Sequence, residues 1–292
     1  MEAIDSEVQA RIPHSCLLKI QSVYDVLKSA ERKAVDFLLR APERVGGMTI
    51  VEFAHEAGCS EATVVRVAKR LGYEGYPELR RDFARVTEEV PDYHYESIAD
   101  GDAPFTVLSK VVQSTIGALQ DSLEIIEGNE YERAVEAIVS ADKMLFCGLG
   151  DAGVVATEAH YRFTRFGVAA YTAVDPDMQL MYASQLGEGD VIVAVSHSGR
   201  SRPILQAVEQ ARAAGATVIA ITNYPMAALA KAADIVLLTA VFTRYLNYEV
   251  MSKRVTQLCI IEALSISYLM RHGASAFEQL KESNQAVDVN KV

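Results

Sequence analysis

From about residue 142 onward, short β-rich runs alternate with segments of helical length, and this alternation constrains the fold more than any other feature of the chain. The β-rich runs lie at residues 143–147, 168–172, 190–195, 216–222 and 234–239. The helical segments lie at residues 152–166, 176–185, 202–214 and 226–233. Runs that are apolar without alternation indicate strands covered on both faces, as in a parallel sheet. We therefore expect an α/β doubly wound parallel sheet, covered by a last apolar helix at about residues 247–271.

The first 90 residues follow a helical period instead, so the 292-residue chain divides into two domains. We expect an all-α domain at residues 15–90, a linker and connecting helix at 91–128, and the α/β domain at 129–280. Residues 91–104 hold Asp, His, Gly and Pro without a period, which is typical of a linker. A helix at about 105–126 follows it.

Within the all-α part, two short helices are predicted on either side of a glycine turn. Ser29 is a candidate N-cap for a preceding helix. Thr49 is a candidate N-cap for a helix that ends at Gly58, and Ser60 for the next helix. That second helix carries an apolar stripe of Val64, Val67, Ala68 and Leu71. The arrangement fits a helix-turn-helix, although spacing alone fits a helical packing unit with a charged outer face equally well.

If the motif binds DNA, its second helix reaches the major groove. Glu61, Thr63 and Arg66 are predicted to point away from the apolar stripe. Arg66 suits guanine and Glu61 can accept a hydrogen bond from cytosine. The further basic residues suit backbone phosphates; they are Lys69, Arg70, Arg80 and Arg81. The predicted DNA contacts are thus Ser60, Glu61, Thr63, Arg66, Lys69 and Arg70.

The net charge of −11 does not exclude DNA, because the acidity belongs mostly to the second part of the chain. Residues 1–90 carry 13 Lys and Arg against 15 Asp and Glu, while residues 91–292 carry 15 against 24. Within residues 64–81 there are five basic residues and two acidic ones. A local basic patch can bind phosphates even on an anionic protein.

Residues 29–85 closely resemble the N-terminal domain of the RpiR family of bacterial regulators. The specific part is SEATVVR followed by LGYEGYPELR. The resemblance implies that residues 60–69 form the recognition helix of a DNA-binding domain. It also implies that Tyr73, Gly75 and Tyr76 belong to the turn that packs the next helix.

Two turns that each follow a predicted strand and precede a helix are candidate ligand sites. The first is glycine-rich and runs from Cys147 to Gly153; such turns bring backbone N–H groups toward an anion. Its GxGxxG spacing is weak evidence for a dinucleotide, and Asp175 falls in a loop where a ribose-binding acid is not clearly placed. The second turn is Ser196-His197-Ser198-Gly199-Arg200-Ser201. Three hydroxyls at a helix N-terminus exceed what capping needs and suit a phosphate.

Residues 130–272 resemble the SIS (sugar isomerase) domain, with GDVIVAVSHSGRSRPILQAVEQARAAGATVIAIT as the most specific segment. The family's phosphosugar loop, S-x-S-G-x-T/S, is matched by Ser196, Ser198, Gly199 and Ser201. The family often has a further serine in the first glycine turn, where this chain has Ala152 after Asp151. Asp151 could hold a ligand hydroxyl or cap the helix. The predicted ligand contacts are Gly150, Asp151, Ser196, His197, Ser198, Gly199 and Ser201.

Two function classes follow from these patterns. One is a transcriptional regulator whose effector, a phosphorylated sugar or sugar acid, changes operator affinity. The other is a sugar-phosphate isomerase or lyase of the SIS type, which needs a positioned base. His160 is expected to be a packing or surface residue, and His197 lacks an evident acid partner. Glu249 and Glu262 lie in the last-helix region, where some SIS enzymes keep acid–base residues, but Glu262 is expected to pair with Lys253 or Arg254. We therefore expect the regulator, with no catalytic residues, no cofactor and no metal.

The remaining features favour a cytoplasmic protein. The first fifteen residues lack the apolar run of a signal peptide, and no apolar stretch approaches the roughly 20 residues of a membrane span. The four cysteines have no CxxC pair and are expected to be reduced thiols in apolar surroundings; they are Cys16, Cys59, Cys147 and Cys259. The expected partners are double-stranded operator DNA, the phosphorylated effector and further copies of the chain in a homodimer or homotetramer, with no membrane.

Overall fold

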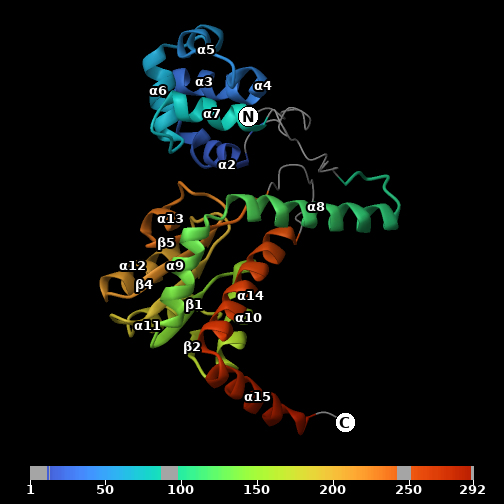
Figure 1. The fold of residues 1–292 in the computed structure, drawn as a ribbon, viewed down its shortest axis with the longest axis vertical. Coiled ribbons are helices and arrows are strands. Elements are labelled where there is room, and N and C mark those ends of the chain that lie inside the picture. Colours follow the sequence, from blue (N-terminus) through green and yellow to red (C-terminus); the bar gives the residue numbers. More distant parts are fainter. Residues whose placement is uncertain (1–11, 13, 87–97, 242–250, 291–292) are drawn as a thin grey trace. The chain divides into compact units, whose positions relative to one another are not determined.

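The computed structural model describes residues 12, 14–86, 98–241 and 251–290. The chain forms two compact units (Figure 1). Unit 1 comprises residues 1–117 with 242–249, and unit 2 comprises residues 118–241 with 250–292. The first half of the predicted linker and the first residues of the predicted helix at 247–271 lie outside the described residues.

Unit 1 is helical where it is described. Its helices are α2 (His14–Val23), the 3₁₀ helix η1 (Tyr24–Val26), α3 (Ser29–Arg40), α4 (Pro42–Val45), α5 (Ile50–Ala57), α6 (Glu61–Arg70), α7 (Tyr76–Val86) and the first part of α8 (Pro104–Ile125). The hydroxyl oxygen of Thr49 accepts the N–H of Glu52 at the start of α5, and Gly58 ends that helix with φ of 64°. Ser60 caps α6. These boundaries confirm the predicted helix, turn and helix.

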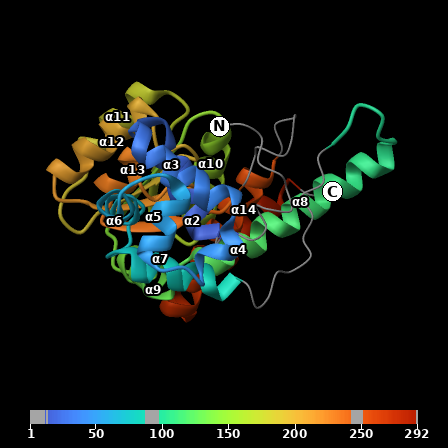
Figure 2. The ribbon, with the colours of Figure 1, turned by 90° about the horizontal axis from the view of Figure 1, so that it is seen from above.

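Helices α3, α5 and α6 pack on one another to form the core of unit 1 (Figure 2). Phe37 and Phe53 meet edge to face with ring centroids 5.1 Å apart. Ser29 does not cap α3 as predicted, because the cap position is Lys28, whose N–H donates to the Glu31 carboxylate at 2.9 Å. A carboxylate three residues into the helix therefore takes over the role predicted for the serine.

Unit 2 contains a five-stranded parallel sheet in the order β2-β1-β3-β4-β5. The strands are β1 (Lys143–Cys147), β2 (Ala169–Thr172), β3 (Val191–Val195), β4 (Thr217–Thr222) and β5 (Ile235–Leu238). The helices are the last part of α8, then α9 (Gly128–Val139), α10 (Asp151–Thr164), α11 (Pro176–Ala183), α12 (Arg202–Ala213), α13 (Ala228–Ala232), α14 (Ser252–His272) and α15 (Ala274–Asp288). The doubly wound fold is thus confirmed.

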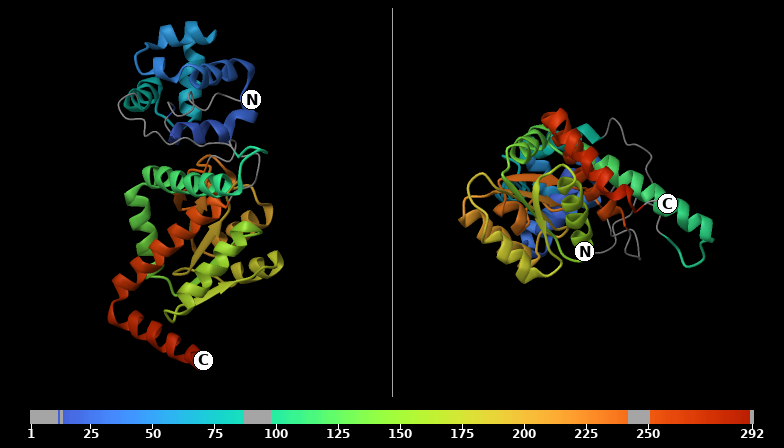
Figure 3. Two further views of the ribbon diagram at one scale, coloured as in Figure 1. Left: turned by 90° about the vertical axis from the view of Figure 1, so that its right-hand side faces the viewer. Right: turned by 90° about the horizontal axis from the view of Figure 1, so that it is seen from below.

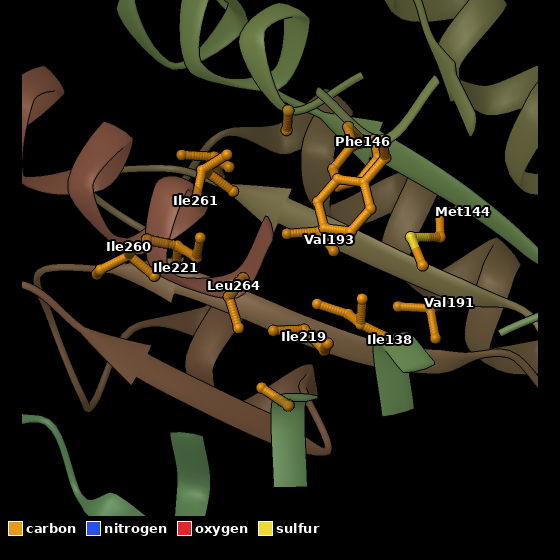
Figure 4. Close-up of a cluster of buried hydrophobic side chains, with 14 of the residues drawn as sticks. Ile138, Met144, Phe146, Val191, Val193, Ile219, Ile221, Ile260, Ile261 and Leu264 are labelled. Atoms are coloured by element: carbon orange, nitrogen blue, oxygen red, sulfur yellow. The ribbon is translucent and has the colours of Figure 1, made fainter. Parts of the chain in front are cut away.

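Each face of the sheet supports its own apolar cluster. Met144, Phe146 and Val193 pack with α9, α10, α14 and α15 on one face (Figure 4). Leu145 and Ile192, their neighbours in sequence, pack with α11, α12 and α13 on the other face. Because successive strand residues point to opposite faces, burial on both sides requires continuous apolar runs. This is the pattern that the sequence shows.

The last two helices complete one of these layers (Figure 3, in red). Helix α14 covers the sheet as predicted, with Ile260, Ile261 and Leu264 buried. Gly273, with φ of 58°, ends α14, and α15 then begins at Ala274. Among the described residues, no helix is long and apolar enough to cross a membrane.

Candidate functional site

The first candidate site is the outer face of α6 in unit 1. Glu61, Arg66 and Lys69 are exposed there, on the side opposite the buried Val64 and Val67. Arg80 and Arg81 on the following helix, α7, are exposed as well. The helix therefore presents a carboxylate near its N-terminus and cations further along. The carboxylate can accept hydrogen bonds from base edges, and the cations can bind bases or backbone phosphates.

Thr63 is not on the outer face of the helix, because only 2% of the residue is exposed and its side chain faces inward. Its Oγ1 lies 2.9 Å from Ser60 Oγ and accepts a hydrogen bond from Arg66 Nη2 at 3.0 Å. The expectation that Thr63 points away from the apolar stripe is wrong. A threonine in the first turn of a helix can satisfy its hydroxyl locally, which permits burial beside apolar neighbours.

Arg70, at the C-terminal end of α6, is tied to the helix packed behind it. Its Nη2 lies 3.5 Å from Oε1 of Glu31 on α3, and only 4% of Glu31 is exposed. A buried carboxylate needs such a partner, because an uncompensated buried charge is costly. Arg70 thus links α6 to the core.

The turn after α6 is held by two tyrosines. The Tyr73 hydroxyl donates to Asp82 on α7, and the Tyr76 hydroxyl donates to the Met48 carbonyl at 3.0 Å. Burial raises the pKa of Tyr76 to about 12 and also raises the pKa of Tyr73, so both hydroxyls stay protonated donors. The two hydrogen bonds fix α7 against the rest of the unit.

The second candidate site lies at the carboxyl ends of β1 and β3 in unit 2. These strands are neighbours in the sheet, and the chain order reverses between them. Residue Cys147 of β1 pairs with Ala194 of β3, so the first glycine turn and the serine turn emerge side by side. The crevice at such a switch point is where open α/β sheets bind ligands.

Backbone hydrogen bonds shape the serine turn. The N–H of Gly199 donates to the Ser196 carbonyl, and the Gly199 carbonyl accepts from Leu229 N–H at 3.0 Å. Gly199 has φ of 59°, and a Cβ there would lie 2.6 Å from the Cβ of Ala227. Only glycine fits this close approach in the left-handed region. The turn is therefore a built structure, not a loose loop.

The serine hydroxyls are not used for capping. Ser201 occupies the N-cap position of α12 but its side chain makes no cap hydrogen bond. Ser198 Oγ accepts the N–H of Arg200 at 3.3 Å, a local bond within the turn. Ser196 is buried, and the rings of His197 and Tyr224 meet edge to face. The turn thus places hydroxyls at the N-terminus of a 12-residue helix, a combination that favours the binding of an anion.

Asp151, in the first glycine turn, is bound by two cations from α14. Lys253 Nζ lies 2.9 Å from its Oδ2, and Arg254 Nε lies 3.6 Å from its Oδ1. The hydrogen bond from Lys253, assisted by the charge of Arg254, lowers the pKa of the Asp151 carboxyl. Gly150 is the N-cap residue of α10, and no side chain caps that helix. The alternative in which Asp151 caps the helix is therefore wrong.

This arrangement also corrects the partner of Glu262. Its Oε2 lies 2.6 Å from Nη1 of Arg162 on α10, and Arg162 also binds Glu158 at 2.7 Å. Lys253 and Arg254 are instead engaged with Asp151. The sequence could not tell which of these cations pairs with Glu262, because the partner comes from the facing helix.

His160 contacts a residue of its own helix: its Nδ1 lies 3.4 Å from Thr164 Oγ1.

A cavity of about 980 Å³ opens beside the first glycine turn, between α10 and α14. Gly148, Gly150, Val154 and Leu258 line it. Cys259 also lines it and is exposed, so the expectation that every cysteine is a core thiol is wrong there. Burial does raise the pKa of Cys16 and of Cys147 to about 12, as expected of core thiols.

Two buried amides near these turns were missed by sequence reasoning. Gln179 donates to the carbonyls of Gly148 and Ala173, which fixes the first turn from α11. Gln257 on α14 is 1% exposed, and its Nε2 has no hydrogen-bond partner in the described part of the chain. No pattern in the sequence distinguishes these glutamines from surface ones. Among the described residues, no group of three or more His, Cys, Asp or Glu side chains could hold a metal ion.

Comparison with known proteins matches both units. Residues 14–88 match the model of the helix-turn-helix domain of the rpiR family, and residues 137–267 match the SIS domain. The HTH-type transcriptional regulator HexR of Pseudomonas aeruginosa is 30% identical over 93% of this chain and 95% of its own. The bifunctional protein glk of Paraburkholderia xenovorans is 34% identical over 92% of this chain, which spans only 43% of that protein.

A solved structure shows the same fold over nearly the whole chain. The Vibrio vulnificus NanR protein, complexed with ManNAc-6P, is 24% identical and covers 95% of this chain and 100% of its own, with a TM-score of 0.61. The match to HexR runs through both units and almost the full length of each protein. The chain therefore belongs to the RpiR family of helix-turn-helix transcriptional regulators with a C-terminal SIS domain.

Proposed function

We propose that this regulator binds operator DNA through α6 and that a phosphorylated sugar or sugar acid, bound at the carboxyl ends of β1 and β3, changes its affinity for that DNA. The observation that carries the proposal is the serine turn, in which the Ser201 hydroxyl at the N-terminus of α12 makes no cap bond. A phosphate there meets hydroxyls, backbone N–H groups and the positive end of the helix dipole. The NanR complex with ManNAc-6P supports a phosphorylated ligand.

The proposed effector contacts extend over both turns. They are Gly150, Asp151, Ser196, His197, Ser198, Gly199 and Ser201. The cations Lys253 and Arg254 and the buried amide of Gln257 add donors from α14. The proposed DNA contacts are Ser60, Glu61, Arg66 and Lys69, with Arg70 and Thr63 acting from behind the surface.

We propose that effector binding and DNA binding are linked through a homodimer or homotetramer, since an inverted repeat needs two recognition helices. An effector changes DNA affinity only to the extent that its own affinity differs between the DNA-binding state and the other state of the protein. We assign residues 15–90 to DNA binding, 91–128 to the connection and 129–280 to the effector domain. Such a regulator acts in the cytoplasm, where bacterial operators lie.

The proposal assigns no turnover to the chain. Glu262 lies in the helix region where some SIS enzymes keep acid–base residues, but it is held by Arg162, which Glu158 shares. A general base needs to reach the proton that it removes. Turnover of a sugar phosphate by the purified protein, lost in Glu262→Gln, would overturn the assignment in favour of an isomerase or lyase.

A thermal-shift screen tests the effector site directly. The panel pairs hexose 6-phosphates, pentose 5-phosphates and 6-phosphogluconate with their unphosphorylated counterparts. We expect only phosphorylated compounds to raise the melting temperature of unit 2, because a ligand that binds the folded unit stabilises it by mass action. Ser201→Ala is expected to abolish the shift, whereas Ser275→Ala, an exposed serine on α15, should retain it. An equal shift in both variants would place the ligand elsewhere.

A further inference from the structure

The start of α6 contains a chain of hydrogen bonds that ends on the side chain proposed to bind a base. Ser60 Oγ accepts the N–H of Thr63 at 3.2 Å and lies 2.9 Å from Thr63 Oγ1. Thr63 Oγ1 in turn accepts Nη2–H of Arg66 at 3.0 Å. Ser60 and Arg66 are exposed, whereas Thr63 is 2% exposed. A buried hydroxyl thus connects two surface side chains.

Arg66 has only donors, so Thr63 Oγ1 is the acceptor in the hydrogen bond between them. In the contact between the two hydroxyls either oxygen can donate, and Ser60 Oγ also accepts the N–H of Thr63. Thr63 Oγ1 therefore holds the guanidinium that follows it in the helix.

Orientation matters for an arginine because its side chain otherwise samples many rotamers. Immobilising a rotamer-rich side chain on binding costs affinity, and a group already held in place avoids part of that cost. A guanidinium that uses one N–H inward still has four others for a base edge. Its planar fork gives specificity only when the plane is correctly aimed.

We propose that Thr63 is a positioning residue for sequence-specific DNA binding, which holds Arg66 through its buried hydroxyl without touching DNA. The inference rests on the proposed role of α6 in DNA recognition. It replaces the expectation of a direct DNA contact by Thr63, which its burial disfavours. The ion pair between Arg70 and Glu31 ties the other end of the same helix to α3.

The test compares two substitutions of Thr63 in the full-length protein. Thr63→Val keeps the branched shape and removes the hydroxyl, whereas Thr63→Ser keeps the hydroxyl. The probes are a DNA duplex selected by the wild-type protein from a random-sequence pool and a scrambled duplex of equal length. We expect Thr63→Val to weaken binding of the selected duplex about three- to tenfold, the range set by one immobilised side chain. Binding of the scrambled duplex should stay unchanged, and Thr63→Ser should bind like the wild type.

A double-mutant cycle with Arg66→Ala separates positioning from a structural effect. If Thr63 acts through Arg66, Thr63→Val has no further effect on the selected duplex in the Arg66→Ala background. An equal loss in both backgrounds, or an equal loss on the scrambled duplex, would mean that Thr63 merely supports the helix and would overturn the inference. A normal affinity of Thr63→Val for the selected duplex would overturn it as well.

The cycle also distinguishes failure of this inference from failure of the proposed function. Selection that yields no preferred duplex, or an Arg66→Ala protein with unchanged affinity, would remove α6 from DNA recognition altogether. A loss in Arg66→Ala with none in Thr63→Val would leave the recognition helix in place and reject only the positioning role.

Discussion

At the scale of single residues, Asp151 shows how one side chain can change the character of a turn. SIS domains often have a serine at the position of Ala152, directly after Asp151. Here Ala152 is buried, and Asp151 forms ion pairs with Lys253 and Arg254. The turn is thereby joined to the start of α14 by an ion pair. A ligand that enters this site therefore meets a carboxylate whose negative charge is offset by two cations.

Asp151→Asn should make stability less dependent on pH in the acid range. The pKa of Asp151 is lowered in the folded state by Lys253, so its ion pair contributes stability above the unfolded value of about 3.9. That contribution is lost as the pH falls through the folded pKa. We expect a loss below about 1 kcal/mol at neutral pH, because the side chain is 37% exposed.

Urea unfolding at a series of pH values measures this effect. The difference between the wild type and Asp151→Asn should shrink as the pH falls below the unfolded value of about 3.9 and disappear once the folded-state carboxyl is protonated. Asp177→Asn, an exposed aspartate in the first turn of α11, serves as the control. A difference that persists at the lowest pH would show that the substitution acts through something other than the carboxylate charge.

At the scale of elements, the serine turn depends on its contacts with the next βα unit. The Gly199 carbonyl accepts from Leu229 N–H, and the His197 carbonyl accepts from Asn223 N–H at 3.1 Å. Both partners lie in the segment that follows β4, so the turn after β3 is held by hydrogen bonds to the segment after the neighbouring strand. This explains why a six-residue turn can hold hydroxyls in place without a cap bond.

Gly199→Ala should destabilise unit 2 by about 2 kcal/mol or more. Its φ of 59° disfavours any residue with a Cβ, and that Cβ would lie 2.6 Å from Ala227 Cβ. Gly187→Ala is the matched control, because a Cβ at Gly187 meets nothing within 4 Å. Chemical denaturation of both proteins gives the comparison. Equal stabilities would contradict the close packing described for the turn.

At the scale of the whole molecule, the two units have separate cores. Phe53 lies in unit 1 against Phe37 and Tyr76, and Phe163 lies in unit 2 against Phe146 and Tyr268. Each ring is almost completely buried. A chain with two cores can depart from two-state unfolding, so a single melting temperature would not describe it.

Phe53→Ala and Phe163→Ala should therefore affect different calorimetric transitions of the full-length chain. Each removes a buried ring, which costs about 3–5 kcal/mol in the unit that contains it. A phosphorylated ligand should raise only the transition that Phe163→Ala lowers. If both substitutions lower one common transition equally, the units unfold together and the separate-core description fails.

Local patterns in the sequence determined much of this fold. Continuous apolar runs, such as Val191–Val195, can be buried on both faces only in a covered parallel sheet, and Gly58 between Thr49 and Ser60 marks a turn between two capped helices. The serine turn was also recognisable, because its hydroxyls follow a strand and precede a helix. Each of these features is encoded within a few neighbouring residues.

Tertiary structure decided the features that depend on distant partners. The pairing of Glu262 with Arg162 instead of Lys253 and the partner of Arg70 both arise from how helices face one another. The sequence patterns likewise do not predict helices α9 and α15. Long polar side chains reach several neighbours at similar cost, so only the packed geometry selects among them.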